Sequence, residues 1–330
     1  MYADERRCAP GVCPHACAET GFGTEKVDLH THTWFSDGTL SPTRLVQMAA
    51  EKGIELLAIT DHDGVSGLAE GREAACACGI RFLPGIEFSA QLSMTRSAVA
   101  AEDAADAATA DGVAEEHLNR NIYMHLLGYG FDPQNAALLE CMAELRQNRA
   151  ERNDAMRSAL LELGFPLRKE DIEVYPGQPY IGKPNFARAL VRAGYASSIE
   201  EAFSSDRMMA APTVRAVHRK KIDAGRAISL IRGAGGFVSL AHPCKISRCG
   251  SWKEDPKQFM RSLEQVVARL SEMGLSGMEC RYSSHTEQQE NALCALAEKY
   301  GLTVTAGSDY HGPGIKKNVE LGQLRAEQKI

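Results

Sequence analysis

The feature that most constrains the fold is an alternation of short apolar segments and amphipathic segments, with polar side chains following the apolar ones. Short apolar segments are typical of buried strands, and the amphipathic stretches between them are typical of helices. This order predicts an α/β fold with a parallel sheet, whose functional residues gather where the strands end. The expected strands cover residues 27–29, 54–59, 80–86, 122–130, 236–241, 277–280 and 302–306, and the helices between them cover residues 41–52, 65–78, 224–233, 256–273 and 287–299.

Two pairs of polar residues stand at opposite ends of the chain. His30 and His32 follow the first expected strand, and Asp309 and His311 follow the last. Residues two apart on a strand project to the same face, so each pair points one way. Pairing of the first strand with the last would close the sheet into a barrel and bring the two pairs together.

Further imidazoles and carboxylates occupy comparable positions after other strands. A lone histidine within an apolar strand, such as His125, is more often a core residue than a ligand, and its place in this series is what favours a ligand role. The set is too large for one ion and contains no cysteine, so it suits two or three divalent metal ions such as Mn²⁺, Fe²⁺ or Zn²⁺. The nine candidate ligands are His30, His32, Asp37, His62, Glu87, His125, His242, Asp309 and His311.

Composition limits the remaining possibilities. The 330 residues carry a net charge of −6, with an isoelectric point near 6.0, which disfavours binding of extended nucleic acid. No apolar run approaches the length of a membrane span, and the first two dozen residues contain no signal-peptide-like core. We therefore expect a cytoplasmic protein without a membrane partner. The sequence carries no signal for its oligomeric state.

Four regions are expected along the chain. Residues 1–24 form a flexible extension whose Cys8, Cys13, His15 and Cys17 are incidental or, as the alternative, bind zinc. Residues 93–119 are a low-complexity loop insertion, with a lid over the site as the alternative. Residues 132–215 show helical patterns without an intervening strand and predict an inserted helical subdomain. Residues 25–131 and 216–330 then make up the barrel.

A helix start within the expected subdomain carries Lys183, Asn185 and Arg188. Backbone N–H groups at a helix start attract anions, so these residues are candidates for binding a phosphorylated substrate. The alternative is that the two cations form an ordinary solvated face.

The ordered motifs resemble those of the PHP (polymerase and histidinol phosphatase) superfamily. They run as HxH, Asp, Thr-Asp-His, Glu, His, Ala-His-Pro and Ser-Asp-x-His, within residues 27–311. The resemblance implies a distorted (β/α)7 barrel with the inserted helical subdomain, and a metal-dependent phosphoric ester hydrolase. The segment Gly-Lys-Pro-Asn-Phe-Ala-Arg resembles a subgroup of small phosphoesterases in which Arg-Pro-His is more frequent, so Lys183 and Asn185 depart from that pattern.

The same resemblance implies how the ligands divide among the ions. The first metal would be held by His30, His32, Glu87 and Asp309. The second would be held by Glu87, His125 and His242, and the third by Asp37, His62 and His311. Glu87 and Asp309 would thus be part of the catalytic centre. Substrate contacts are expected from Lys183, Asn185, Arg281, Ser283 and His285, and His285 is also a candidate for protonating the leaving group.

The expected activity is hydrolysis of a small sugar or nucleotide phosphate. The resemblance favours cyclic phosphodiesterase action on 5-phosphoribosyl 1,2-cyclic phosphate with release of phosphate. Alternatives are a nucleoside 3′,5′-bisphosphate phosphatase and a 5′-3′ exonuclease on short RNA or DNA. A non-catalytic module is disfavoured because all nine ligand positions are filled.

Overall fold

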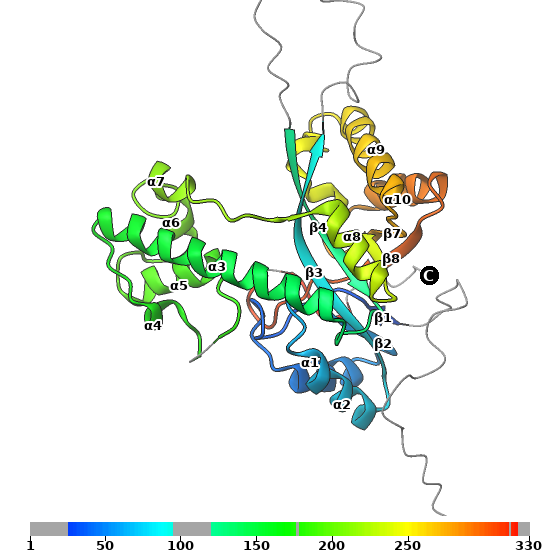
Figure 1. The fold of residues 1–330 in the computed structure, drawn as a ribbon, viewed down its shortest axis with the longest axis horizontal. Helices are drawn as coiled ribbons and strands as arrows, with labels where there is room; N and C mark the ends of the chain where they lie inside the picture. Colours follow the sequence, from blue (N-terminus) through cyan, green and yellow to red (C-terminus); the bar gives the residue numbers. More distant parts are fainter. Residues whose placement is uncertain (1–25, 95–119, 176–177, 317, 323–330) are drawn as a thin grey trace, which may run out of the picture.

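The computed structural model describes residues 26–94, 120–175, 178–316 and 318–322 (Figure 1). Two predicted segments lie outside these ranges. They are the cysteine-containing extension over residues 1–24, and the insertion over residues 93–119 apart from its first two residues.

Strands from the whole length of the described chain join in one sheet. Seven follow the order β1-β2-β3-β4-β6-β7-β8, and β5 pairs with β3 outside that path. The strands are β1 (Val27–Asp28), β2 (Leu56–Ile59), β3 (Arg81–Met94), β4 (Arg120–Tyr129), β5 (Ile222–Asp223), β6 (Phe237–Leu240), β7 (Gly277–Tyr282) and β8 (Thr303–Gly307).

The first and last strands meet, as the sequence predicted. The Leu29 N–H donates to the Ala306 carbonyl at 3.0 Å, and Thr31 forms a parallel bridge with Tyr310. These contacts bring the two edges of the sheet together and confirm the distorted seven-stranded α/β barrel. A small apolar core fills its interior, with residues on or next to every strand of the ring except β7. This core contains Val27, Leu29, Leu56, Ala58, Leu83, Leu127, Tyr129, Ala241 and Ala306, with Phe237 packed against it.

One part of the sheet differs from the prediction. The expected parallel arrangement is wrong for β4, which pairs antiparallel with both β3 and β6. Strand β3 pairs in parallel with β2 only as far as Pro84, and from Gly85 to Met94 it forms a long antiparallel ladder with β4. Glu87 therefore lies in the middle of β3 rather than at its end, because the ladder with β4 extends the strand well beyond β2.

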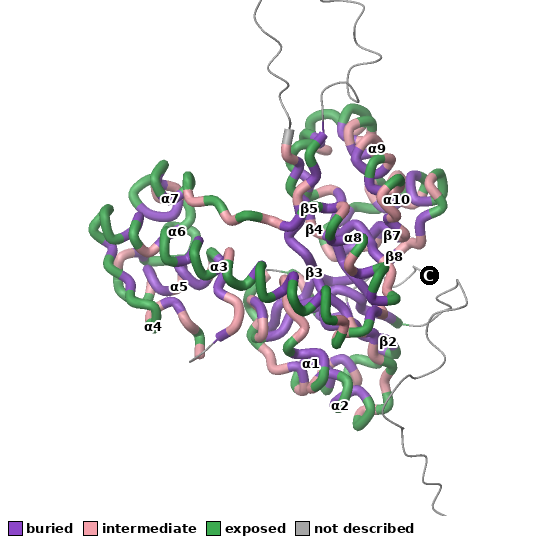
Figure 2. Tube along the Cα trace, viewed as in Figure 1, coloured by how far each residue is buried: buried purple, intermediate pink, exposed green. Residues whose placement is uncertain are grey.

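The helices surround the sheet or form a separate lobe. In Figure 2 the strands at the centre are mostly buried, whereas the outer helices carry exposed faces. No helix in the described ranges is long and apolar enough to cross a membrane. The helices are α1 (Pro42–Glu51), α2 (Leu68–Cys78), α3 (Ala136–Glu162), α4 (Lys169–Ile172), α5 (Lys183–Arg192), α6 (Ile199–Ser204), α7 (Pro212–Arg215), α8 (Ala224–Gly233), α9 (Pro256–Glu272) and α10 (Glu287–Lys299), with 3₁₀ turns η2 (Pro243–Lys245) and η3 (Ser247–Cys249).

Helix α3 connects the barrel to the lobe that contains α4 to α7 (Figure 1). Its first half, including Leu138 and Leu145, packs into the core around the barrel, whereas Met156 and Leu160 in its second half belong to a second apolar core. That second core extends to Val214 on α7. We propose on this ground that residues 132–215 form the inserted subdomain, with α3 holding it against the barrel.

Candidate metal centre

The segments after β1 and β8 lie side by side and position four candidate ligands. The Asp309 N–H donates to the His30 carbonyl at 2.8 Å, and the His32 N–H donates to the Tyr310 carbonyl at 2.9 Å. This parallel pairing aligns His30 and His32 with Asp309 and His311, and all four are buried. The two ends of the chain thus build one edge of the site together.

The structure brings all nine predicted ligands together. They form four overlapping groups, in each of which one ligand atom from every residue lies within 4.8 Å of the others. The groups are His32, Asp37, His62 and His311; His30, His32 and Asp309; His30, Glu87 and His242; and His62, Glu87 and His125.

Glu87 lies at the centre of this arrangement. Its Oε1 is 2.8 Å from His125 Nδ1 and 3.1 Å from His242 Nε2, and its Oε2 is 2.9 Å from His62 Nδ1. Burial alone would raise the pKa of Glu87, but the surrounding imidazoles, beginning with His125, hold it well below its ordinary value. Glu87 is therefore a fixed negative charge shared by neighbouring groups.

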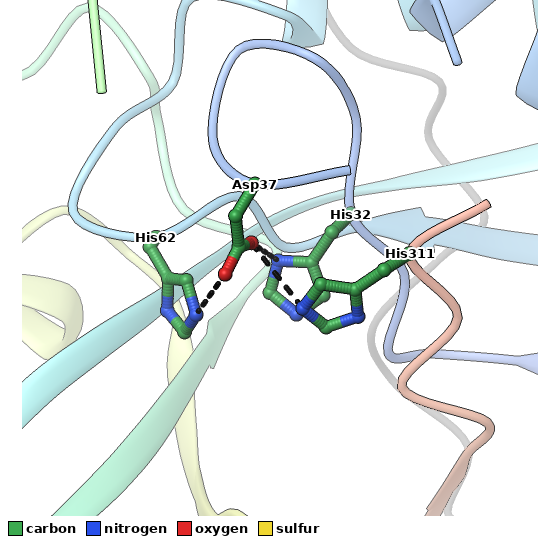
Figure 3. Close-up of side chains that lie close together, drawn as sticks. All are labelled: His32, Asp37, His62 and His311. Carbon is green, nitrogen blue, oxygen red and sulfur yellow. Dashed lines mark ion pairs between the residues drawn. The ribbon is translucent and has the colours of Figure 1, made fainter. Parts of the chain in front are cut away.

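Asp37 lies among three of the candidate histidine ligands, as Figure 3 shows. Its Oδ1 is 3.2 Å from His311 Nε2 and 3.8 Å from His32 Nδ1, and its Oδ2 is 3.6 Å from His62 Nε2. The carboxylate lies between imidazoles from three separate strand ends. The family resemblance implies Asp37, His62 and His311 for one ion, and the structure places His32 beside these three residues.

The residues fit divalent metal ions. Within the described chain, four buried ligand atoms make no hydrogen bond of suitable geometry, although charged or imidazole groups lie close to them: His30 Nε2, His32 Nε2, Asp37 Oδ1 and His62 Nδ1. Buried polar atoms of this kind are normally satisfied, and imidazole nitrogens and carboxylate oxygens are the ligands that Mn²⁺, Fe²⁺ and Zn²⁺ accept. Positive ions at these positions would satisfy all four atoms together.

Backbone strain is concentrated at the same place. Asp63, His242 and Asp309 adopt positive φ angles of 51°, 26° and 59°, in the region that disfavours side chains other than glycine. Among the described residues only Asn318 shares this property without being glycine. Such strain persists where the surrounding structure fixes a side chain for a function.

Sequence reasoning missed the residues that orient the ligands. Glu279 on β7 is fully buried, and its Oε1 is 2.9 Å from His30 Nδ1 while its Oε2 accepts the His242 N–H at 2.7 Å. Burial lowers the pKa of His30, yet the carboxylates of Glu279, Glu87 and Asp309 outweigh it and hold that pKa well above its ordinary value. A carboxylate that accepts a hydrogen bond from the ring nitrogen facing away from the metal fixes the tautomer and direction of a ligating imidazole. Nothing in the local sequence around Glu279 distinguishes it from any other strand glutamate.

Asp309 is oriented in a similar way. The Tyr282 hydroxyl donates to its Oδ2 at 2.7 Å, and Lys316 Nζ donates to the same oxygen at 2.5 Å. Its Oδ1 then faces His30 and His32, at 3.5 and 3.3 Å from their Nε2 atoms.

The predicted substrate residues are placed less favourably. Asn185 is buried, and its Oδ1 accepts the Gly182 N–H while its Nδ2 donates to the Ile172 carbonyl. Both ends of this amide are occupied by the protein, which argues against the predicted substrate contact. Lys183 is exposed and can contact an anion.

The strand end after β7 also differs from expectation. A hydrogen bond from the Cys280 thiol and the nearby Arg281 guanidinium lower the pKa of Cys294 on α10 below its ordinary value, which places Arg281 beside this pair of thiols. His285 is buried, with its Nδ1 at 3.0 Å from the Cys280 carbonyl, and burial lowers its pKa. Burial thus disfavours the protonated imidazole that would be needed to protonate a leaving group. Ser283 Oγ is buried without a hydrogen-bond partner in the described chain.

A group of cations adjoins the candidate ligands on the side of the helical lobe. Arg149 and Arg219 both pair with Asp63 Oδ2, and Arg152 and Lys183 lie near enough for like charges to lower their pKa values. Burial, with the charges of Arg149 and Arg219, lowers the pKa of Arg152 to about 10. Within the described chain, Asp63 pairs with two of these four cations, Arg149 and Arg219, so the group retains an excess of positive charge.

An aromatic side chain links this cationic group to the candidate ligands. The Tyr180 ring stacks on His62 with the ring centroids 5.4 Å apart, and the Arg149 guanidinium lies 3.7 Å from the centre of the same ring. Residues adjacent in sequence, His62 and Asp63, therefore face the metal-ligand cluster and the cationic group respectively.

Comparison with protein families identifies a match to the PHP domain over residues 28–151. The chain is 29% identical over 311 residues to a 5′-3′ exoribonuclease of Haemophilus influenzae. The alignment covers 90% of this chain and 96% of that protein. It is 29% identical to a 3′,5′-nucleoside bisphosphate phosphatase of Chromobacterium violaceum, covering 87% and 88% of the two chains. A phosphoribosyl 1,2-cyclic phosphate 1,2-diphosphodiesterase of Eggerthella lenta is 26% identical, covering 86% of this chain and 94% of that protein.

A solved structure extends this similarity to the fold. A protein of Bifidobacterium adolescentis, described as a metal-dependent phosphoesterase, superposes with a TM-score of 0.70 and 30% sequence identity. The match covers 91% of this chain and 92% of that one. Barrel and helical lobe are thus both included in the comparison.

Proposed function

The chain belongs to the PHP domain family and is a metal-dependent phosphoesterase, and on that premise we propose that its substrate is a small ester carrying a second phosphate. Candidates of this kind are 5-phosphoribosyl 1,2-cyclic phosphate, a nucleoside 3′,5′-bisphosphate and the 5′ end of a short RNA. The relatives named above act on substrates of these three classes.

We assign two or three divalent ions to the nine ligands. The first ion would be held by His30, His32, Glu87 and Asp309, and the second by Glu87, His125 and His242. The third would be held by Asp37, His62 and His311, with His32 close to this third site. Bound there, such ions supply a water of lowered pKa as nucleophile and stabilise the negative charge that develops on the phosphoryl oxygens. The protein itself contributes the orientation: Glu279 fixes His30, and Tyr282 with Lys316 fixes Asp309.

The observation that carries the proposal is the cationic group around Asp63. Four cations against one carboxylate favour binding of an anion, and guanidinium groups bind phosphate through paired, charge-assisted hydrogen bonds. Among the described residues Arg152 Nε has no hydrogen-bond partner, so one buried donor of this group is unsatisfied. Because Tyr180 connects the group to His62, a second phosphate bound there would lie beside the phosphate that is cleaved.

The experiment compares substrates with and without the second phosphate. Manganese-loaded protein is assayed for phosphate release from the three candidates and from a nucleoside 3′-monophosphate. We expect kcat/KM for at least one two-phosphate substrate to exceed that for the monophosphate tenfold or more. Lys183→Ala should remove most of this preference, whereas Lys169→Ala on the exposed surface of α4 should retain it. Equal rates on both kinds of substrate would contradict the proposal.

A further inference from the structure

A cleft lies between the helical lobe and the segment that follows β8. Its volume, about 530 Å³, is within the range of sites for small organic ligands. It is separate from the cationic group around Asp63 and shares no residue with it. The lining residues are Ser198, Ile199, Glu200, Phe203, Ser204, Gly314 and Ile315.

Large apolar side chains stand on both walls of this cleft. Ile199 and Phe203 on α6 are 45% and 39% exposed, and Ile315 on the opposite wall is 37% exposed. Ile199 and Phe203 are four residues apart and so share one face of α6, while Ala202 points into the core of the lobe. Three apolar side chains are far fewer than a stable protein interface requires, which favours a small ligand over a protein partner.

One wall of the cleft is linked to the metal centre through Lys316. Ile315 directly precedes Lys316, whose Nζ donates to Asp309 Oδ2 at 2.5 Å. On the side of the lobe, α6 follows α5, and α5 carries Arg188. Burial lowers the pKa of Arg188, and the nearby Asp37 carboxylate opposes that shift, so Arg188 lies close to a candidate metal ligand. One ligand could therefore reach from the candidate metal ligands into the cleft.

The charge in the cleft indicates which part of a substrate enters it. Glu200 carries a carboxylate into the lining, and a carboxylate repels a phosphate because their charges have the same sign. A phosphate is thus disfavoured there, and an uncharged ring with hydrogen-bond donors is favoured. Phe203 offers a surface for stacking, and Ser198 and Ser204 offer polar groups at the edge.

We propose that this cleft binds the base of a nucleotide substrate, with Phe203 and Ile315 on either side of the ring. This inference rests on the proposed function and narrows it, since it favours a nucleotide over a phosphoribosyl substrate. The base contributes binding energy here, and the phosphates bind at the metal ligands and the cationic group.

Binding to metal-free protein tests the inference without turnover. Titration calorimetry compares adenosine 3′,5′-bisphosphate with the 3′,5′-bisphosphate of 1-deoxyribose, which lacks the base. Stacking of a base on an aromatic side chain predicts a Kd at least fivefold lower for the nucleotide. Phe203→Ala should reduce this difference to twofold or less and leave the Kd of the base-free compound unchanged. Leu161→Ala, which removes a 60% exposed apolar side chain from α3, should have no effect on either Kd.

The outcomes separate this inference from the proposed function. Equal Kd values for the two compounds, or absence of binding by both, would overturn the base site. If the metal-loaded enzyme nevertheless hydrolyses both compounds, the proposal of a phosphoesterase stands without the base site. A Phe203→Ala variant that weakens both compounds equally would show a structural effect and would also overturn the base site.

Discussion

Replacing Glu279 by glutamine tests whether the carboxylate behind His30 controls metal binding. Glu279→Gln keeps the size of the side chain but turns one oxygen into an N–H donor. The His242 N–H requires an acceptor, so the amide oxygen must face it and the amide nitrogen must face His30 Nδ1. His30 Nδ1 would then accept, and its proton would move to Nε2, the atom that faces Glu87 and Asp309. A protonated Nε2 cannot ligate a metal.

The size of the effect follows from the hydrogen bonds involved. A buried hydrogen bond to a charged group contributes about 1.5–3 kcal/mol, and 1.4 kcal/mol corresponds to a factor of ten in affinity. The variant should therefore bind its most affected ion about 10- to 100-fold more weakly, which agrees with the usual cost of removing a partner of a ligating histidine. The opposite rotamer of glutamine would bring two N–H donors together at His242 and cost a similar amount.

The assay is competition between the protein and a fluorescent chelator for Mn²⁺. Glu264→Gln serves as the control, because Glu264 pairs with Lys299 at 2.5 Å on the outer surface, away from the ligands. An affinity of Glu279→Gln within twofold of the wild type would refute the role given to Glu279. So would an equal loss in the Glu264→Gln control.

Three further predictions concern the centre and its surroundings. In Gly307→Ala the new Cβ would lie 2.2 Å from His30 Cβ, so we expect about 1–3 kcal/mol lower stability in urea unfolding and weaker Mn²⁺ binding. Burial alone would raise the pKa of Asp63, but Arg219 and Arg149 lower it to about 2, below the value of about 3.9 for an unfolded chain. The contribution of the Asp63 carboxylate to the free energy of unfolding is thus present above pH ~4 and disappears as the pH falls toward 2. The variant Asp63→Asn should be about 3 kcal/mol less stable at pH 7, and its stability should lack this loss between pH ~4 and 2. Removal of metal by a chelator should abolish phosphate release and lower the Tm, and added Mn²⁺ should restore both.

The sequence predicted what depends on local periodicity. His30 and His32 share a face because side chains on a strand alternate, and their match with Asp309 and His311 predicted that the first and last strands pair. The start of α1 at Pro42 lies within one residue of the predicted helix over residues 41–52, and there Ser41 Oγ accepts the Arg44 N–H. These features require only spacing and residue type.

What the sequence did not predict depends on long-range contacts. An apolar pattern carries no strand direction, so β4 was expected to be parallel, and the extension of β3 past Glu87 depends on its ladder with β4. Glu279 lies 249 residues from His30, and no periodicity connects them. Asn185 was assigned to substrate from its place at a helix start, and its hydrogen bonds within the protein argue against that assignment.

Anomalous diffraction from manganese-loaded crystals tests the central claim most directly. The account predicts two or three Mn²⁺ peaks within the nine-residue cluster, with Glu87 contacting at least two of the ions and Asp37 contacting another. A single peak, or peaks that lie outside the cluster, would contradict a polynuclear centre in this protein.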